Sequence, residues 1–178
     1  MYLVSKRAAQ VAGSLTLAID GKAKTMKQQG VDVVSFGAGE PDFDTPLPIQ
    51  QAAIHAMEQG QTRYTPARGT LALRKAICDK LARRNQLRYT PEEIVVTNGA
   101  KQALHDAFCT VLEEDDEVIL MTPCWVSYTE LIRMADGVPV LVERRQEDGF
   151  ALDIEALESA VTEKTRAILV NSPDNPCG

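Results

Sequence analysis

The chain has 178 residues, of which 44% are hydrophobic, and its 25 Asp and Glu against 19 Lys and Arg give a formal charge of −6. This length suffices for a real hydrophobic core, and the ordinary composition excludes a disordered, collagen-like or coiled-coil protein. The acidic balance argues against nucleic acid or an anionic membrane as the main partner, and no apolar run reaches the roughly 18 residues of a membrane span.

The first half of the chain predicts an arm, then helices and short strands. Residues 1–14 have weak periodicity and are expected to form the arm. Apolar spacing predicts a helix over 16–29, a second that begins after Thr45 as N-cap and ends at Gly60, and a third over 70–81. Short strands are predicted over 31–36 and 94–96. We expect the apolar residues of these helices to face inward.

From residue 90 onward, strands and helices alternate regularly. The predicted strands continue with 118–121, 138–142 and 167–170, and the helices cover 103–112, 127–135 and 154–161. This alternation predicts right-handed crossovers and a mainly parallel sheet with helices on both faces. Pro139 lacks a backbone N–H and is therefore expected at a sheet edge or at the start of its strand.

Three polar loops follow predicted strands: residues 97–101, 122–125 and 171–178. In open α/β sheets the ligand crevice lies at the carboxyl ends of the strands, so these loops are the candidate site. In the first loop Asn98 is a candidate N-cap and Gly99 permits close approach, which suits either a phosphate or an ordinary helix start. Lys101 fits a phosphate-proximal or solvated lysine better than a reactive amine.

The other two loops carry an aromatic and an amide side chain. Trp125, the only tryptophan, is either a core residue or a stacking surface for a ligand ring. Asn175, which precedes Pro176, is a turn residue by default, and its amide is also able to bond a ring oxygen.

Further polar residues have structural explanations. Glu40, Asp42 and Asp44 could bind a metal or act in acid/base catalysis, but tight turns and the helix cap account for most of them. The loop over 63–69, with Arg63, Tyr64 and Arg68, is either merely exposed or reaches an anion across a subunit boundary. The histidines, His55 and His105, are expected to face solvent without Cys, Asp or Ser partners at catalytic spacing.

Together, five ordered motifs resemble the class I/II pyridoxal-phosphate (PLP) aminotransferases, most closely their bacterial aspartate branch. The motifs are Ser35–Pro46, Arg63–Pro66, Val95–Leu104, Trp125–Tyr128 and Asn171–Pro176. The resemblance implies a PLP-dependent transferase of fold type I, which moves an amino group from an amino acid to a 2-oxo acid. A Rossmann-like nucleotide-binding domain also fits the alternation, but the Gly-x-Gly-x-x-Gly turn that it requires is missing from the sequence.

The resemblance also implies residue roles. Gly99, Ala100 and Lys101 match the start of the helix that binds the phosphate of PLP. Trp125 matches the residue that stacks on the pyridine ring, and Asn175 matches the residue that hydrogen-bonds the phenolic oxygen. Tyr64 matches the tyrosine that reaches the phosphate in the partner subunit, which implies a homodimer. Gly39, Trp125 and Asn175 match positions near the substrate, with the Gly39 N–H on the α-carboxylate. No metal is implied.

The chain departs from the family pattern at several positions. Cys124 and Cys177 replace a usual Tyr and Thr, Thr129 replaces a usual Pro, and residues 113–116 lack the usual Pro-Gly turn. The four cysteines, which also include Cys78 and Cys109, are scattered along the chain and indicate reduced thiols in a cytoplasmic protein. The N-terminus lacks a secretory signal.

The largest departure is that the Schiff-base lysine of the family matches none of the eight lysines here. We therefore expect an N-terminal half, inactive alone, with the sheet incomplete on its C-terminal side. The expected divisions are an arm (1–14), a small-domain or interdomain segment (15–45) and half of the large PLP-binding domain (46–178). The alternative is a non-catalytic binding module, or a split-enzyme half that needs a separate C-terminal partner.

Overall fold

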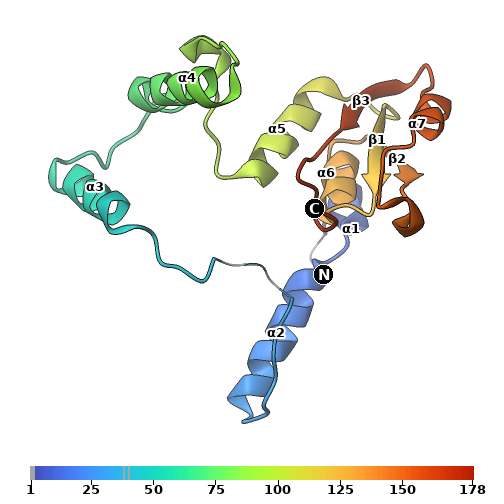
Figure 1. Cartoon of the computed structure of the whole chain (residues 1–178), viewed down its shortest axis with the longest axis horizontal. Helices are drawn as coiled ribbons and strands as arrows, with labels where there is room; N and C mark the ends of the chain where they lie inside the picture. Colours follow the sequence, from blue (N-terminus) through green and yellow to red (C-terminus); the bar gives the residue numbers. More distant parts are fainter. Residues whose placement is uncertain (1–2, 38, 40) are drawn as a thin grey trace. The chain divides into compact units, whose positions relative to one another are not determined.

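The computed structural model describes residues 3–37, 39 and 41–178. Its elements are α1 (Lys6–Gln10), α2 (Leu15–Gln28), α3 (Leu47–Glu58), α4 (Leu71–Asn85), η1 (Pro91–Glu93), α5 (Ala100–Val111), β1 (Glu117–Thr122), α6 (Ser127–Met134), β2 (Val138–Glu143), η2 (Gln146–Asp148), α7 (Ile154–Ala160) and β3 (Thr165–Leu169) (Figure 1). The described chain divides into two compact units, one formed by residues 3–18 with 99–178 and the other by the described part of residues 19–98. The domain boundaries expected from the sequence stay a prediction.

The first unit is built on a sheet. Within the described residues the sheet has three strands in the order β2-β1-β3. Both pairings are parallel, which confirms the parallel sheet that the alternating pattern predicts. Pro139 lies at the second position of the edge strand β2, which confirms its expected place. The central strand β1 is buried along its length because it has a neighbour on each side.

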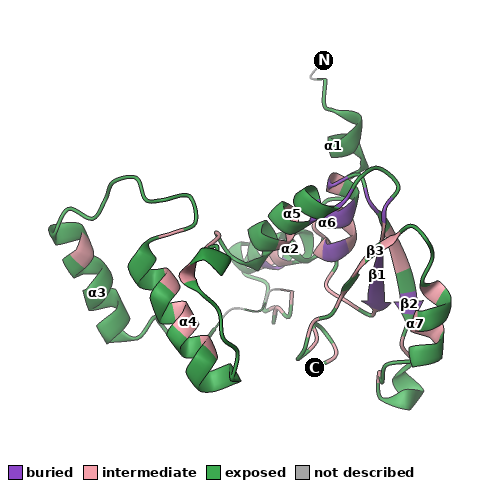
Figure 2. Ribbon diagram, turned by 90° about the horizontal axis from the view of Figure 1, so that it is seen from above, coloured by how far each residue is buried: buried purple, intermediate pink, exposed green. Residues whose placement is uncertain are grey.

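The core lies between β1 and two helices. Val118 and Leu120 alternate along β1 onto the face that α5 and α6 cover, where Phe108, Tyr128 and Ile132 pack against them. Figure 2 shows β1 and the inward side of α6 as buried. This packing fixes the carboxyl end of β1, and with it the loop that begins α6.

The predicted arm contains the short helix α1, which weak periodicity did not indicate. Ser5 caps α1, its side chain accepting a hydrogen bond from the Ala8 N–H at 3.1 Å. Arg7 forms an ion pair with Asp136 at 2.7 Å, and the Ala12 N–H donates to the Glu130 carboxylate at 2.9 Å. These contacts hold the segment against α6 and the residues that follow it.

The second unit contains helices whose apolar faces remain largely exposed, contrary to our expectation. Ala23 is buried in α2, whereas Ile49 and Met57 of α3 and Leu73 of α4 are exposed. An apolar stripe is buried only where another element packs against it, and the described part of the unit supplies few such surfaces. Thr70 is the N-cap of α4, which confirms the predicted start of this helix. The N-cap of α3 is Pro46, so the prediction of Thr45 is wrong.

Two predicted strands are wrong. Residues 31–36 and 94–96 run as irregular chain, and no strand among the described residues pairs with either of them. In the second segment the Val96 N–H donates to the Arg68 carbonyl at 3.1 Å, in the manner of a ladder bond. β-Branched residues favour an extended backbone, but a strand also needs a neighbour, and this the local pattern does not reveal.

The turn before β1 shows how the chain replaces the Pro-Gly turn that it lacks. Asp115 adopts a left-handed conformation with φ of 67°, which Asp tolerates better than most residues. Asp116, a buried carboxylate, accepts the Glu113 N–H at 2.9 Å and the Arg166 Nε of β3 at 3.2 Å. The backbone hydrogen bond first, and Arg166 second, hold the pKa of Asp116 below its ordinary value.

The lowered pKa of Asp116 predicts a loss of stability in acid. The unfolded carboxyl titrates near 3.9, so its contribution is complete above about pH 5 and is lost as the pH falls through the lower folded pKa. We expect Asp116→Asn to be less stable than the parent chain at pH 7 and to lose less stability on acidification. Urea midpoints at pH 7, 5 and 3 measure this, with Asp148→Asn as the surface control. Parallel acid dependence in Asp116→Asn and the parent chain would contradict the role.

Candidate functional site

The three strands end at one edge of the sheet because they are parallel. β1 ends at Thr122 and leads through residues 123–126 into α6, and β2 is followed directly by Arg144. β3 is followed by residues 170–178. This edge carries two of the three loops that the sequence singles out, and a ligand crevice of an open α/β sheet lies at such an edge.

The start of α5 is shaped for close approach of a ligand. Its N-cap is Gly99, with φ of 82°, so the prediction of Asn98 as N-cap is wrong. Glycine takes this conformation without strain, and no described atom lies within 4 Å of the position that a Cβ would occupy. Gly99, Ala100 and Lys101 are exposed. The N–H groups and dipole of a 12-residue helix favour an anion at such a start.

Lys101 joins the start of α5 to the β1–α6 loop. Its Nζ lies 5.0 Å from the centroid of the Trp125 ring, within cation–π range. A nucleophilic lysine needs a desolvated site, whereas Lys101 is exposed, which favours the predicted role near a phosphate or in solvent. The structure thus brings together two predicted cofactor-binding residues that are far apart in the sequence.

Trp125 is half-buried and is partly a core residue, and its role as a stacking surface for a ligand ring stays a prediction. One side packs on the core, where its ring meets Tyr128 edge-to-face at 5.3 Å between centroids and 85° between planes. The Tyr128 N–H donates to the Trp125 carbonyl at 3.0 Å, which ties the tryptophan to the first turn of α6. The indole is therefore held by its surroundings and still presents part of its surface.

Asn175 lies in a turn, as its neighbour Pro176 predicts. The Gly178 N–H donates to the Asp174 carbonyl at 2.9 Å and closes this turn around Asn175. Asn175 is exposed. The turn lies at the carboxyl edge of the sheet, and the role of Asn175 toward a ligand stays a prediction.

Arg144 and Asp174, which the sequence does not single out, form a nearly buried ion pair between the end of β2 and the loop that follows β3. They line a small pocket together with Cys124, Tyr128 and Asn171. Burial, and then the charge of Asp174, raise the pKa of the Cys124 thiol and of the Tyr128 hydroxyl. Both missed residues follow strands at their carboxyl ends, and this position is the signal that could have identified them.

Two predicted site residues belong to the other unit. Tyr64 is fully exposed and Gly39 is exposed, and their expected roles stay predictions. The loop over 63–69 is mostly exposed, with the Arg68 Nη1 donating to the Glu92 carbonyl at 2.6 Å. Glu40, one of the three carboxylates considered for a metal, lies outside the described residues. Among the residues described, no group of three His, Cys, Asp or Glu side chains could hold a metal ion.

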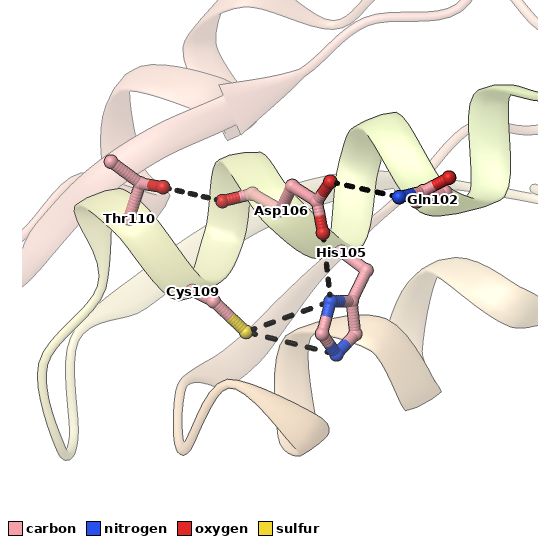
Figure 3. Close-up of polar contacts among 5 residues, drawn as sticks. All are labelled: Gln102, His105, Asp106, Cys109 and Thr110. Carbon is pink, nitrogen blue, oxygen red and sulfur yellow. Dashed lines mark hydrogen bonds and ion pairs between the residues drawn. The ribbon is translucent and has the colours of Figure 1, made fainter. Parts of the chain in front are cut away.

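His105 has Cys and Asp neighbours on its own helix, although it was expected to lack such partners at catalytic spacing. Figure 3 shows its ring beside Cys109 and Asp106 on one side of α5. The Cys109 Sγ lies 3.8 Å from each ring nitrogen, and the Asp106 carboxylate lies 3.4 Å from Nδ1. Since the sulfur is equidistant from both nitrogens, neither is aimed at it as a base would be, and the group is a helix-surface cluster.

Comparison with known proteins identifies the fold and then the family. The solved aspartate aminotransferase from Thermus thermophilus with maleate superposes with a TM-score of 0.96 at 47% identity, over 99% of this chain and 46% of that one. The Rhizobium meliloti enzyme gives 0.93 at 44% identity, over 99% and 44%. These neighbours confirm the prediction of a PLP-dependent transferase of fold type I.

Relatives in sequence agree. The family model for aminotransferase class I and II matches residues 31–178. Aspartate aminotransferase of Bacillus sp. (strain YM-2) is 50% identical over 176 residues, 99% of this chain and 45% of that protein. The probable aspartate/prephenate aminotransferase of Aquifex aeolicus is 49% identical over 98% and 44%. The chain belongs to the class I and II aminotransferases and spans about 45% of the length of these relatives.

Family membership carries general properties. PLP is the general cofactor of these enzymes, their substrates are amino acids and 2-oxo acids, and their assembly is typically homodimeric. Among the described residues, no helix has the length and apolar character required to cross a bilayer.

Proposed function

We propose that this chain forms the PLP-binding part of an aspartate-type aminotransferase. One observation carries the proposal: the Lys101 ammonium lies over the Trp125 ring, which brings the anion-binding start of α5 and an aromatic surface together. PLP needs both, since it has a phosphate and a flat ring. The open space beside Gly99 fits the close approach of such a phosphate.

When bound, PLP supplies the electron sink that lets a bond at the α-carbon of an amino acid break. The residues of this chain bind and orient. The α5 N–H groups and Lys101 bind the phosphate, Trp125 contacts the ring face, and the Asn175 amide donates to the phenolic oxygen. The Gly39 N–H binds the α-carboxylate of the substrate. In a homodimer, Tyr64 reaches the phosphate of the PLP that is bound to the partner subunit. We place the protein in the cytoplasm, in keeping with its four free thiols.

The single tryptophan makes binding directly measurable. We expect added PLP to quench the fluorescence of Trp125 saturably in the 178-residue chain, with inorganic phosphate competing for the same site. Pyridoxal without its phosphate is the control and should bind much more weakly. Absence of saturable quenching, together with absence of bound PLP after ultrafiltration, would overturn the proposed function.

Trp125→Ala should weaken PLP binding about two- to tenfold, because an aromatic pair contributes about 0.5–1.5 kcal/mol beyond its buried area. Ultrafiltration with PLP absorbance measures the affinity of variants that lack the fluorescent probe. Trp125→Phe keeps an aromatic face and should retain most of the affinity. Equal affinities of Trp125→Ala and the parent chain would remove Trp125 from the site.

The second candidate is a non-catalytic binding module, or a split-enzyme half that needs a separate C-terminal partner; the chain spans about 45% of the length of the relatives. Like the first candidate, it predicts no transamination of aspartate and 2-oxoglutarate by this chain alone, so the two candidates differ in what a separate second half restores. An intact second half encoded separately, and activity restored when the two polypeptides are mixed, would support it. Transamination by the 178-residue chain alone would exclude it.

A further inference from the structure

Arg144 is attached to the β1–α6 loop by both its backbone and its side chain. Its N–H donates to the Thr122 carbonyl at 2.8 Å, which extends the β1–β2 ladder by one bond. Its Nη2 donates to the Pro123 carbonyl at 2.7 Å. The same nitrogen forms the ion pair with the Asp174 carboxylate. One side chain, fixed at the end of a strand, therefore contacts two loops.

Asp174 fixes the second loop in the same double manner. Its carboxylate pairs with Arg144, and its carbonyl accepts the Gly178 N–H that closes the turn around Asn175. Asn175 follows Asp174 directly, and Trp125 lies two residues after Pro123. The ion pair thus links the loop of Trp125 to the loop of Asn175, through residues that lie close to Trp125 and Asn175 in the sequence.

The burial of this pair distinguishes it from the ion pairs on the surface. The side chains of Arg144 and Asp174 are 10% and 8% exposed, whereas the neighbouring pair Arg145–Asp148, at 2.9 Å, is 70% and 51% exposed. The Arg144 Nε is also buried without a hydrogen-bond partner in the part of the chain that the structure describes. Burying charges costs free energy that their attraction repays only in part, so the pair is weak as a source of stability. A role in position accounts for it better.

We propose that the Arg144–Asp174 pair is a strut that positions the loops of Trp125 and Asn175 for the cofactor ring. Neither side chain is a catalytic residue; both act through the loops that they join. The inference rests on the proposed function only for the ligand, because the strut itself is a property of the chain without PLP.

Hydrogen–deuterium exchange of the 178-residue chain without PLP tests the strut. We expect Arg144→Met to accelerate exchange about tenfold or more in the loops over 122–126 and 171–178, with the amides of 118–121 unchanged. Arg145→Met is the matched control, since it removes an adjacent arginine of the same charge from an exposed pair. Unchanged exchange in both loops of Arg144→Met would overturn the strut.

A second variant keeps the test decisive if Arg144→Met unfolds the sheet. Asp174→Asn preserves the shape and an acceptor oxygen and removes only the charge, and Asp148→Asn is its control. Asp174→Asn should accelerate exchange in both loops, and the double variant Arg144→Met/Asp174→Asn should accelerate it by less than the two single effects combined. Additive effects on the exchange rate, or faster exchange confined to one loop, would overturn the pairwise strut.

PLP titration of the same variants separates the strut from the proposed function. We expect Arg144→Met and Asp174→Asn to bind PLP about tenfold more weakly than their controls. Loosened loops with unchanged PLP affinity would overturn the positioning role. Loosened loops in variants of a chain that never binds PLP would support the strut and overturn the proposed function instead.

Discussion

Leu120→Ala should lower the free energy of unfolding by about 2–5 kcal/mol, the range for deleting a buried leucine side chain. Leu120 is fully buried in the central strand β1, between β2 and β3 and against the α5–α6 layer. The cavity cannot collapse easily because neighbours constrain it on all sides. Since a domain is stable by about 5–15 kcal/mol, this one change should remove a large share of the total.

The ladder partner of Leu120 supplies the control. Leu141 pairs with Leu120 in the β1–β2 register but lies on the edge strand and is 57% exposed. Leu141→Ala should therefore cost much less than Leu120→Ala. Urea unfolding followed by the fluorescence of Trp125, which packs against the same core, compares the two. Equal losses would mean that burial does not distinguish the two positions.

Gly137→Ala should be destabilising by about 1–3 kcal/mol, because an added methyl overpacks a filled space. A Cβ at Gly137 would lie 2.8 Å from the Leu112 Cδ1 and 3.2 Å from the Asp116 carbonyl oxygen. The leucine tip could shift, but the carbonyl belongs to the turn before β1, and its oxygen accepts the Val138 N–H at 2.8 Å. The added methyl group would therefore disturb the hydrogen bond at the start of the β1–β2 pairing.

The same substitution elsewhere in the chain should have the opposite sign. Gly21 lies inside α2 with no described atom within 4 Å of a Cβ. Gly21→Ala should stabilise by about 0.5–1 kcal/mol, because alanine loses less backbone entropy in a helix. Thermal unfolding of the two variants beside the parent chain measures the contrast. A neutral Gly137→Ala would show that the carbonyl gives way.

Local pattern predicts the sheet unit well and the other unit less well, for one physical reason. The strands β1, β2 and β3 and the helices α5, α6 and α7 follow from periodicity, because each one packs against another element of the same segment. Residues 31–36 have an equally apolar pattern, but no described strand pairs with them. Periodicity indicates what a segment could bury, and only the fold decides whether a partner is present.

Some residues of the candidate site can be recognised in the sequence, and others cannot. Gly99, Lys101, Trp125 and Asn175 stand out in the sequence because glycine, tryptophan and Asn-Pro mark unusual loops. The Arg144–Asp174 pair does not, since the two residues lie far apart in sequence and each resembles a surface charge. The Lys101–Trp125 contact also joins separate segments, and side-chain spacing within either segment could not predict it.

The strand order has a consequence for how the chain assembles. β1 pairs with β2 through residues 117 and 138, but with β3 through residues 119 and 168. Loops between distant partners close at a greater entropic cost, so the β3 contact belongs to the later steps of folding. During synthesis the central strand gains its second neighbour only after residue 169 has emerged, and Asp174 follows five residues later. The charged contact at the carboxyl edge therefore follows the pairing of β3 with β1, and its protection in a pulse-labelling experiment would report that these three strands have come together.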